Sequence, residues 1–203
     1  MINIVTLPLG NYQTNCYIVY AQGSDRCAVI DPGFEPETVL QQTAALGLTI
    51  DAILLTHGHF DHVGGVKEIC RSTGCGLWIH RDDQVMTGNP TTRFFYPLSG
   101  QELANLQFCE EGQVLPVAGL EFTVLSTPGH TNGSVCYRCE DALFSGDTLF
   151  AGSCGRTDLP GGNYPTICAS LARLAQLPQD LRVFPGHGGS STIGREKQTN
   201  PYL

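Results

Sequence analysis

Three histidines and one aspartate lie close together in the motif THGHFDH, which begins at Thr56. The motif follows a short apolar run, residues 52–55, which has the length of a buried strand. His57 and His59 are two positions apart, so they project to the same side of an extended chain end. Neutral imidazole and carboxylate groups are ligands of Zn²⁺ and of neighbouring first-row metals. The motif therefore predicts a metal site at the end of a strand, rather than a solvated polar loop.

Asp61 and His62 supply the other two donors of the motif, where the chain is expected to enter a helix over residues 63–73. Three further candidate ligands each follow a strand-like run and come directly after a glycine: His130, Asp147 and His187. Glycine suits positions where the backbone passes close to a site or turns sharply. His80 ends the run 77–80 without such a setting, and we predict an ordinary strand-end histidine there.

The order of these residues resembles that of the metallo-β-lactamase superfamily, and the resemblance covers almost the whole chain. It rests on the THxHxDH signature, a later Gly-His, a Gly-Asp and a final Gly-His. Within the superfamily the sequence is most similar to glyoxalase II (hydroxyacylglutathione hydrolase) of the short, single-domain type, on LFSGDTLFAGSCGR at residues 143–156. The resemblance implies an α/β fold, a four-layer αββα sandwich of two mixed β-sheets. It also implies one domain over residues 1–203, with the site at one edge.

The resemblance further implies that seven donors bind two divalent metal ions. The first ion would be held by His57, His59 and His130, the second by Asp61, His62 and His187, and Asp147 would bridge them. Zn²⁺ is the expected metal, and iron and manganese are the alternatives. By itself, the position of Asp31 after the run 27–30 suits either a turn residue or a carboxylate that orients a metal-bound imidazole. The resemblance favours the second role.

The activity that the resemblance implies is hydrolysis of a hydroxyacyl-thioester such as S-lactoylglutathione. A hydroxide that bridges the two metals would attack the carbonyl carbon, with Asp61 orienting it, so no Ser or Cys nucleophile is needed. In full-length glyoxalase II a helical C-terminal extension supplies much of the glutathione site. Only residues 188–203 follow His187 here, so another thiol carrier remains an alternative.

Two other functions also remain open. Persulfide dioxygenases share the same seven residues but use a single iron, held by two His and one Asp, to oxidise glutathione persulfide. A non-catalytic metal-binding module would keep the ligands without the reaction. Subclass B1 zinc β-lactamases are disfavoured, because they place a Cys ligand where this chain has Asp147. Metal content and oxygen consumption would distinguish the thioester hydrolase from the persulfide dioxygenase.

Two regions are candidates for substrate contacts. Arg156 lies in a glycine-rich stretch, and in glyoxalase II a basic residue at the matching position contacts the glutathione portion of the substrate. Asp158 is an alternative partner for this guanidinium, and it stands where those enzymes carry an aromatic contact. The segment 87–104 has no regular period and contains Phe94, Phe95 and Tyr96. We predict that it covers the active site, with these aromatic side chains either contacting substrate or packing the segment down.

Charge and composition limit the partners. The formal net charge of −8 argues against binding to a nucleic-acid backbone, which requires clustered Lys and Arg. No apolar segment has transmembrane length, and the first residues lack the basic and apolar regions of a signal peptide. We therefore expect a cytoplasmic enzyme with a small-molecule thioester substrate and no nucleic-acid or membrane partner; the sequence leaves the oligomeric state open. The nine cysteines are expected to be reduced and mostly buried, with Cys154 the exposed one.

The remaining elements follow from apolar runs and turn residues. We predict strands over residues 2–7, 15–20, 27–30 and 76–80, and a helix over 36–46 that ends at Gly47. Two hairpins are expected, 113–117 with 120–125 and 134–138 with 142–145, and a last helix over 164–177. In the second hairpin, Cys136 and Cys139 should point to opposite faces of the sheet.

Overall fold

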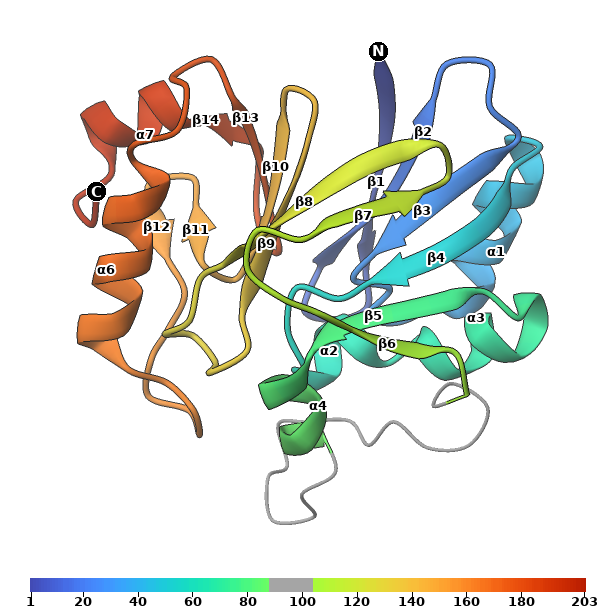
Figure 1. Cartoon of the computed structure of the whole chain (residues 1–203), viewed down its shortest axis with the longest axis horizontal. Helices are drawn as coiled ribbons and strands as arrows, with labels where there is room; N and C mark the ends of the chain where they lie inside the picture. The colour runs from blue at the N-terminus through green and yellow to red at the C-terminus, as the bar shows by residue number, and fades with distance from the viewer. Residues whose placement is uncertain (88–103) are drawn as a thin grey trace.

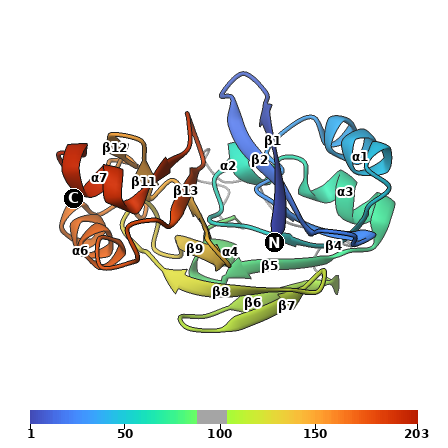
Figure 2. The same ribbon diagram turned by 90° about the horizontal axis from the view of Figure 1, so that it is seen from above.

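The computed structural model describes residues 1–87 and 104–203. Two six-stranded sheets face each other, and helices cover their outer faces (Figures 1 and 2). The predicted four-layer αββα arrangement is confirmed. Phe94, Phe95 and Tyr96 lie outside the described residues, so the role of their segment stays a prediction. None of the described helices is long and apolar enough to cross a membrane.

The first sheet is formed by the N-terminal half of the chain in sequential order. Its strands are β1 (Ile2–Leu9), β2 (Thr14–Ala21), β3 (Arg26–Ile30), β4 (Thr49–Leu54), β5 (Gly76–His80) and β6 (Leu106–Cys109). The first three strands pair antiparallel, and the pairs from β3 to β6 are parallel. Helices α1 (Pro36–Ala45) and α3 (Val66–Thr73) provide the crossovers between the parallel strands β3, β4 and β5. Their apolar sides pack on this sheet.

The second sheet has the order β14-β13-β10-β9-β8-β7. Its strands are β7 (Val114–Val117), β8 (Leu120–Ser126), β9 (Val135–Cys139), β10 (Ala142–Gly146), β13 (Arg182–Pro185) and β14 (Ser191–Thr192). Only β10 and β13 pair parallel, joined through a small hairpin, β11 (Leu149–Phe150) with β12 (Ser153–Cys154), and through helix α6 (Tyr164–Leu174). Figure 1 shows α6 and α7 (Ile193–Thr199) on the outer side of this sheet.

Three apolar clusters separate the four layers. The central cluster between the sheets contains Tyr17, Phe122 and Tyr137. A second lies between the first sheet and its helices, and a third lies under α6. Strands β3 and β4 contribute side chains to both faces, which explains why they read as continuous apolar runs rather than alternating ones. Cys136 lies under α6 and Cys139 between the sheets, so the predicted opposite orientation is confirmed.

One sequence prediction was wrong in an informative way. The helix expected over residues 63–73 is two helices, α2 (Phe60–Val63) and α3, separated at Gly64 and Gly65. A Cβ on Gly64 would overlap the carbonyl oxygen of Gly33, and the Gly65 N–H donates to the carbonyl oxygen of Pro32 at 2.8 Å. The turn after β3 therefore presses against the chain here and interrupts the helix.

Other boundaries agree closely with the expectations. Strand β5 has the predicted limits, while α6 ends three residues earlier than expected, at Leu174. The sequence analysis did not predict β6 or the short helices α4 (Arg81–Thr87) and α7. All nine cysteines are free thiols, and seven are buried. Cys154 is partly exposed as expected, and Cys168 is as well.

Candidate metal centre

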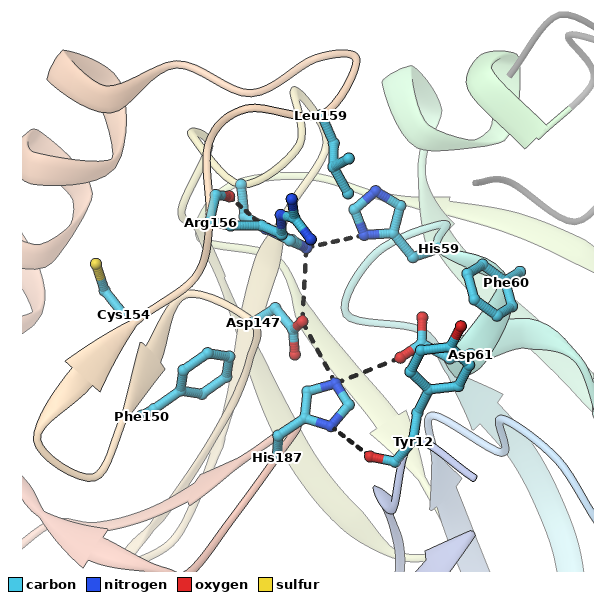
Figure 3. A pocket seen from close by; sticks show the side chains of 11 residues that line it. Tyr12, His59, Phe60, Asp61, Asp147, Phe150, Cys154, Arg156, Leu159 and His187 are labelled. Carbon is cyan, nitrogen blue, oxygen red and sulfur yellow. Dashed lines mark hydrogen bonds and ion pairs between the residues drawn. The ribbon is translucent and has the colours of Figure 1, made fainter. Parts of the chain in front are cut away.

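The seven predicted ligands come together where the two sheets meet at one edge. His57 and His59 follow β4, and Asp61 and His62 lie in α2. His130 comes from the connection between β8 and β9. The last two ligands follow β10 and β13 in the second sheet: Asp147 and His187. Both halves of the chain therefore contribute to one site (Figure 3).

The ligand atoms form two groups with Asp147 between them. Within each group they lie within 4.8 Å of one another; the groups are His57, His59 and His130, and Asp61, His62 and His187. Asp147 Oδ1 lies 3.3 Å from His62 Nε2. Its Oδ2 lies 3.6 Å from the Nε2 atoms of both His130 and His187. One carboxylate thus faces histidines of both groups.

Hydrogen bonds at Nδ1 fix the orientation of four of the five histidines. His62 Nδ1 lies 2.9 Å from Asp31 Oδ2, and His130 Nδ1 lies 2.7 Å from the carbonyl oxygen of Arg156. His187 Nδ1 donates to the carbonyl oxygen of Tyr12 at 3.2 Å. Because carbonyl and carboxylate oxygens only accept, Nδ1 carries a proton, and Nε2 is the nitrogen left for a metal.

His57 is oriented in the same way through a hydroxyl group. Its Nδ1 lies 3.0 Å from Thr56 Oγ1, and this hydroxyl donates its proton to Asp31 Oδ2 at 2.7 Å. The hydroxyl oxygen therefore accepts a hydrogen bond from His57 Nδ1, and Nε2 of this ring is left for a metal. His59 is the exception, since its Nδ1 faces His130 Nε2 at 2.8 Å. Four Nε2 atoms and one Nδ1 atom thus point into the site.

The donor set fits metal ions. Within the described part of the chain, no hydrogen-bond partner is found for His57 Nε2, His62 Nε2 or Asp147 Oδ1, although all three atoms are buried. Buried polar atoms without a partner are costly and rare. A Cβ on Gly186 would overlap Asp147 Oδ1 and approach His62 Cε1 to 2.7 Å, so the backbone lies directly against the ligands. Convergent imidazole and carboxylate groups are suited to zinc or iron.

The pKa shifts divide the candidate histidine ligands into two sets. Burial, together with His62 and His59, lowers the pKa of His57 well below its usual value, and burial lowers that of His59 to about 3. Burial opposes ionisation of Asp61, but its interactions with His187 and His62 outweigh burial and lower its pKa. Neutral imidazoles and an ionised carboxylate are the forms that bind metals. Burial also opposes protonation of His62 and His187, but the carboxylates beside them outweigh burial and raise their pKa values, so each of these rings would release a proton on binding a metal.

Asp31 forms a third close group with His57 and His62, but its oxygens already have partners. It accepts hydrogen bonds from the backbone N–H and the hydroxyl of Thr56 and from His62 Nδ1, at 2.7–2.9 Å. The structure therefore places Asp31 behind the imidazole rings rather than among the groups that point into the site.

Asp83, which the sequence analysis missed, connects the two loops that carry the first group of histidines. It is fully buried at the start of α4. Its Oδ2 accepts from the N–H of Gly58 at 2.7 Å and from Thr131 Oγ1 at 2.8 Å, and its Oδ1 accepts from the N–H of Gly133 at 2.7 Å. Gly58 lies between His57 and His59, and Thr131 follows His130. Asp83 therefore fixes the spacing between these loops.

The second group is held by polar residues of β2 that were also missed. Thr14 Oγ1 donates to Asp61 Oδ2 at 3.1 Å. Asn15 donates to the carbonyl oxygens of Pro185 and Gly188, and Tyr17 donates to that of Pro185 at 2.6 Å. The turn that carries His187 is thus anchored to the first sheet. In the sequence these residues resemble ordinary strand positions, because their partners lie 47 residues away for Thr14 and 168–173 residues away for Asn15 and Tyr17.

A cavity of about 440 Å³ opens above the ligands. Tyr12 and Phe60 form one wall, with ring centroids 5.2 Å apart, while Phe150, Cys154 and Leu159 line the other (Figure 3). Arg156 also lines the cavity, and its Nε and Nη2 groups donate hydrogen bonds to the carboxylate of Asp158. His80 belongs to none of the donor groups found in the described residues, consistent with its expected role at a strand end.

The chain is similar to known proteins over most of its length. A model of the metallo-beta-lactamase superfamily matches residues 9–187, which include all seven candidate ligands. Hydroxyacylglutathione hydrolase GloC of Haemophilus influenzae is 36% identical over 208 residues, covering 99% of this chain and 98% of that protein.

Two solved structures are similar over their whole length. BLEG-1, a B3 metallo-beta-lactamase, is 34% identical with a TM-score of 0.90, covering 100% of this chain and 99% of that one. TTHA1623, solved in a di-iron-bound form, is 39% identical with a TM-score of 0.85, covering 98% of this chain and 100% of that one.

Proposed function

This chain belongs to the metallo-β-lactamase superfamily and has the buried His/Asp cluster of a metallo-hydrolase; we propose that it hydrolyses thioesters with two bound metal ions. The observation that carries the proposal is the position of Asp147 between two groups of three donors. Similarity to GloC over the whole chain supports a hydroxyacyl-thioester as the substrate class.

In this proposal His57, His59 and His130 would hold the first ion, Asp61, His62 and His187 would hold the second, and Asp147 would serve both. Bound metal ions lower the pKa of water and polarise a carbonyl group, which is the chemistry that thioester hydrolysis requires. Zinc is the proposed metal. Iron is the alternative, because the similar protein TTHA1623 was solved in a di-iron-bound form.

The protein's own groups position the reactants. Asp61 Oδ2 accepts a hydrogen bond from Thr14 and lies 3.3 Å from His187 Nε2, so its carboxylate has a fixed direction at the floor of the cavity. We propose that Asp61 accepts a hydrogen bond from the attacking water and orients it toward the substrate carbonyl. The apolar side chains that line the cavity leave room for the acyl group.

Metal analysis of the purified protein, combined with assays of S-lactoylglutathione hydrolysis and oxygen consumption, tests the proposal. We expect two metal equivalents per chain, thioester cleavage that is lost on chelation and recovered on adding metal, and no oxygen uptake. Full activity with a single equivalent contradicts the two-metal centre. Oxygen uptake with a glutathione persulfide and one iron per chain would instead identify a persulfide dioxygenase.

β-Lactam hydrolysis is a second candidate, because the similarity to BLEG-1 also extends over the whole chain. A chromogenic cephalosporin assayed beside the thioester distinguishes the two. We expect kcat/KM for the thioester to be the higher of the two values by at least about tenfold, a difference of about 1.4 kcal/mol in transition-state stabilisation. The reverse order would favour a β-lactamase.

A further inference from the structure

Arg156 is the one Lys or Arg among the described residues that line the cavity. Apart from the candidate metal ligands, the other lining residues are aromatic, aliphatic or thiol side chains: Tyr12, Phe60, Phe150, Cys154 and Leu159. Outside the candidate metal centre, this guanidinium is therefore the one cationic side chain that the described walls offer to an anionic group of a substrate. Its availability bears on how the cavity receives a charged thiol carrier.

The backbone of Arg156 is fixed against the metal centre. Its carbonyl oxygen accepts the hydrogen bond from His130 Nδ1 at 2.7 Å. A Cβ on the preceding residue, Gly155, would overlap the carbonyl oxygen of Asp147 and lie 3.2 Å from His130 Nδ1. The backbone at Arg156 is therefore held beside the candidate ligands, and a shift of this backbone away from the cavity would break its hydrogen bond with His130.

Asp158 binds the guanidinium with both carboxylate oxygens. Arg156 Nε donates to Oδ1 and Nη2 donates to Oδ2, each at 2.7 Å. This is the paired geometry with which arginine recognises a carboxylate ligand. The hydrogen bonds from Arg156 lower the pKa of Asp158 to about 2, so both partners are charged under assay conditions.

We propose that Asp158 competes with the substrate for Arg156. The cavity then selects thioesters whose thiol carrier has no carboxylate within reach of the guanidinium. A carboxylate of the substrate has to displace Asp158 or bind the remaining N–H groups beside its negative charge. An uncharged carrier meets no such penalty. This inference rests on the proposed thioesterase function and adds to it a substrate class, uncharged thioesters.

The test compares two lactate thioesters, S-lactoylglutathione, which has two carboxylates, and the N-acetylcysteamine thioester, which has none. Asp158→Asn removes the competing charge and keeps the size of the side chain. We expect the ratio of kcat/KM for the charged substrate to that for the uncharged one to rise by about three- to tenfold, as one exposed charge-assisted pair is released. In an Arg156→Ala background the same substitution should change this ratio by no more than about twofold, because the competition requires Arg156.

A matched control exists where strands β10 and β13 begin, at the ends opposite to those that Asp147 and His187 follow. Arg182 binds Asp141 through the same paired arrangement, Nε to Oδ2 and Nη2 to Oδ1, each at 2.8 Å, and both side chains are similarly exposed. Asp141→Asn removes a surface ion pair of the same kind without touching the cavity. It should leave the substrate ratio unchanged.

A binding measurement keeps this inference separate from the proposed activity. Calorimetry with S-hexylglutathione, which is not hydrolysed, should give a Kd at least about threefold lower for metal-loaded Asp158→Asn than for wild type. If the wild-type protein cleaves neither thioester, the proposed function fails, yet this titration still decides the role of Asp158. An unchanged substrate ratio together with an unchanged Kd would overturn the inference and leave the pair with a purely structural role.

Discussion

Asp31 Oδ2 lies 2.9 Å from Nδ1 of His62, and both side chains are almost completely buried. The same oxygen accepts the hydroxyl proton of Thr56, which in turn accepts from His57 Nδ1. His57 and His62 belong to different groups of candidate ligands. One buried carboxylate therefore sets the tautomer of a histidine in each proposed metal site.

Asp31→Asn should weaken the binding of both metal ions by about ten- to hundredfold, the usual effect of losing a partner that orients a ligating histidine. If the amide oxygen keeps the hydrogen bond from the backbone N–H of Thr56, the amide NH₂ group faces the Thr56 hydroxyl and His62 Nδ1. Titration against a chromophoric chelator measures both affinities. Asp25→Asn, at an exposed position, is the control and should bind like wild type. Unchanged affinity in Asp31→Asn would show that packing alone orients the rings.

Asp147→Ala should reduce kcat more than replacement of any single histidine ligand, because Asp147 faces both groups. The comparison with His187→Ala is the sharpest, since His187 has an exposed fraction of 29% and belongs to one group. The kcat values have to be compared at equal metal content, so that a missing metal ion is not mistaken for a slower catalytic step. Near-normal turnover by Asp147→Ala would contradict the bridging position.

Asp83→Asn should destabilise the protein by about 2 kcal/mol and lower its affinity for the first metal ion. Three donors converge on the two oxygens of Asp83. The NH₂ group of an asparagine would face at least one backbone N–H, leaving a buried donor without an acceptor. Urea unfolding of the metal-free protein measures the stability, and chelator competition measures the affinity.

Asp82→Asn is the matched control for Asp83, since Asp82 is the preceding residue of the same helix and its side chain is 58% exposed. It should unfold and bind metal like wild type. If both variants behave alike, the hydrogen bonds of Asp83 do not determine the spacing of the loops.

The seven candidate metal ligands could be selected from the sequence because each one has a local signal. His130, Asp147 and His187 all follow an apolar run and a glycine, and the structure brings them together with the THGHFDH motif. Strand limits such as those of β5 were also predictable, since β-forming side chains are bounded there by Gly76 and a polar residue.

What the sequence could not reveal depends on contacts between distant segments. Asp82 and Asp83 are chemically identical neighbours, and only tertiary packing buries one and exposes the other. The break between α2 and α3 arises because Pro32 and Gly33 press on the chain some 30 residues later, which no local periodicity records. Likewise, Asp158 was identified as an alternative partner of Arg156, but the paired geometry required coordinates.

Glu196 provides a test of pH-dependent stability away from the metal centre. This fully buried residue of α7 accepts hydrogen bonds from the N–H of Gly152 at 2.7 Å, from Asn200 Nδ2 at 2.9 Å, and from the hydroxyl of Ser191. Burial raises its pKa, but these hydrogen bonds outweigh burial, and the pKa in the folded protein is lowered. Gly152 lies in the turn of the hairpin that carries Phe150 and Cys154, so Glu196 holds that wall of the cavity.

Glu196→Gln should therefore destabilise the protein by about 1–3 kcal/mol at pH 7, because it removes the charge of a carboxylate that accepts three buried hydrogen bonds. A carboxyl group whose pKa is lowered on folding stabilises the protein above its unfolded pKa, near 4.3, and this stabilisation is lost as the pH falls through the folded value. The difference between wild type and variant should accordingly shrink at acidic pH. Urea unfolding of the chelated proteins from pH 7 downward measures it, with Glu121→Gln at an exposed position of β8 as the control. A difference that stays constant with pH would show that the effect comes from packing rather than from the carboxylate charge.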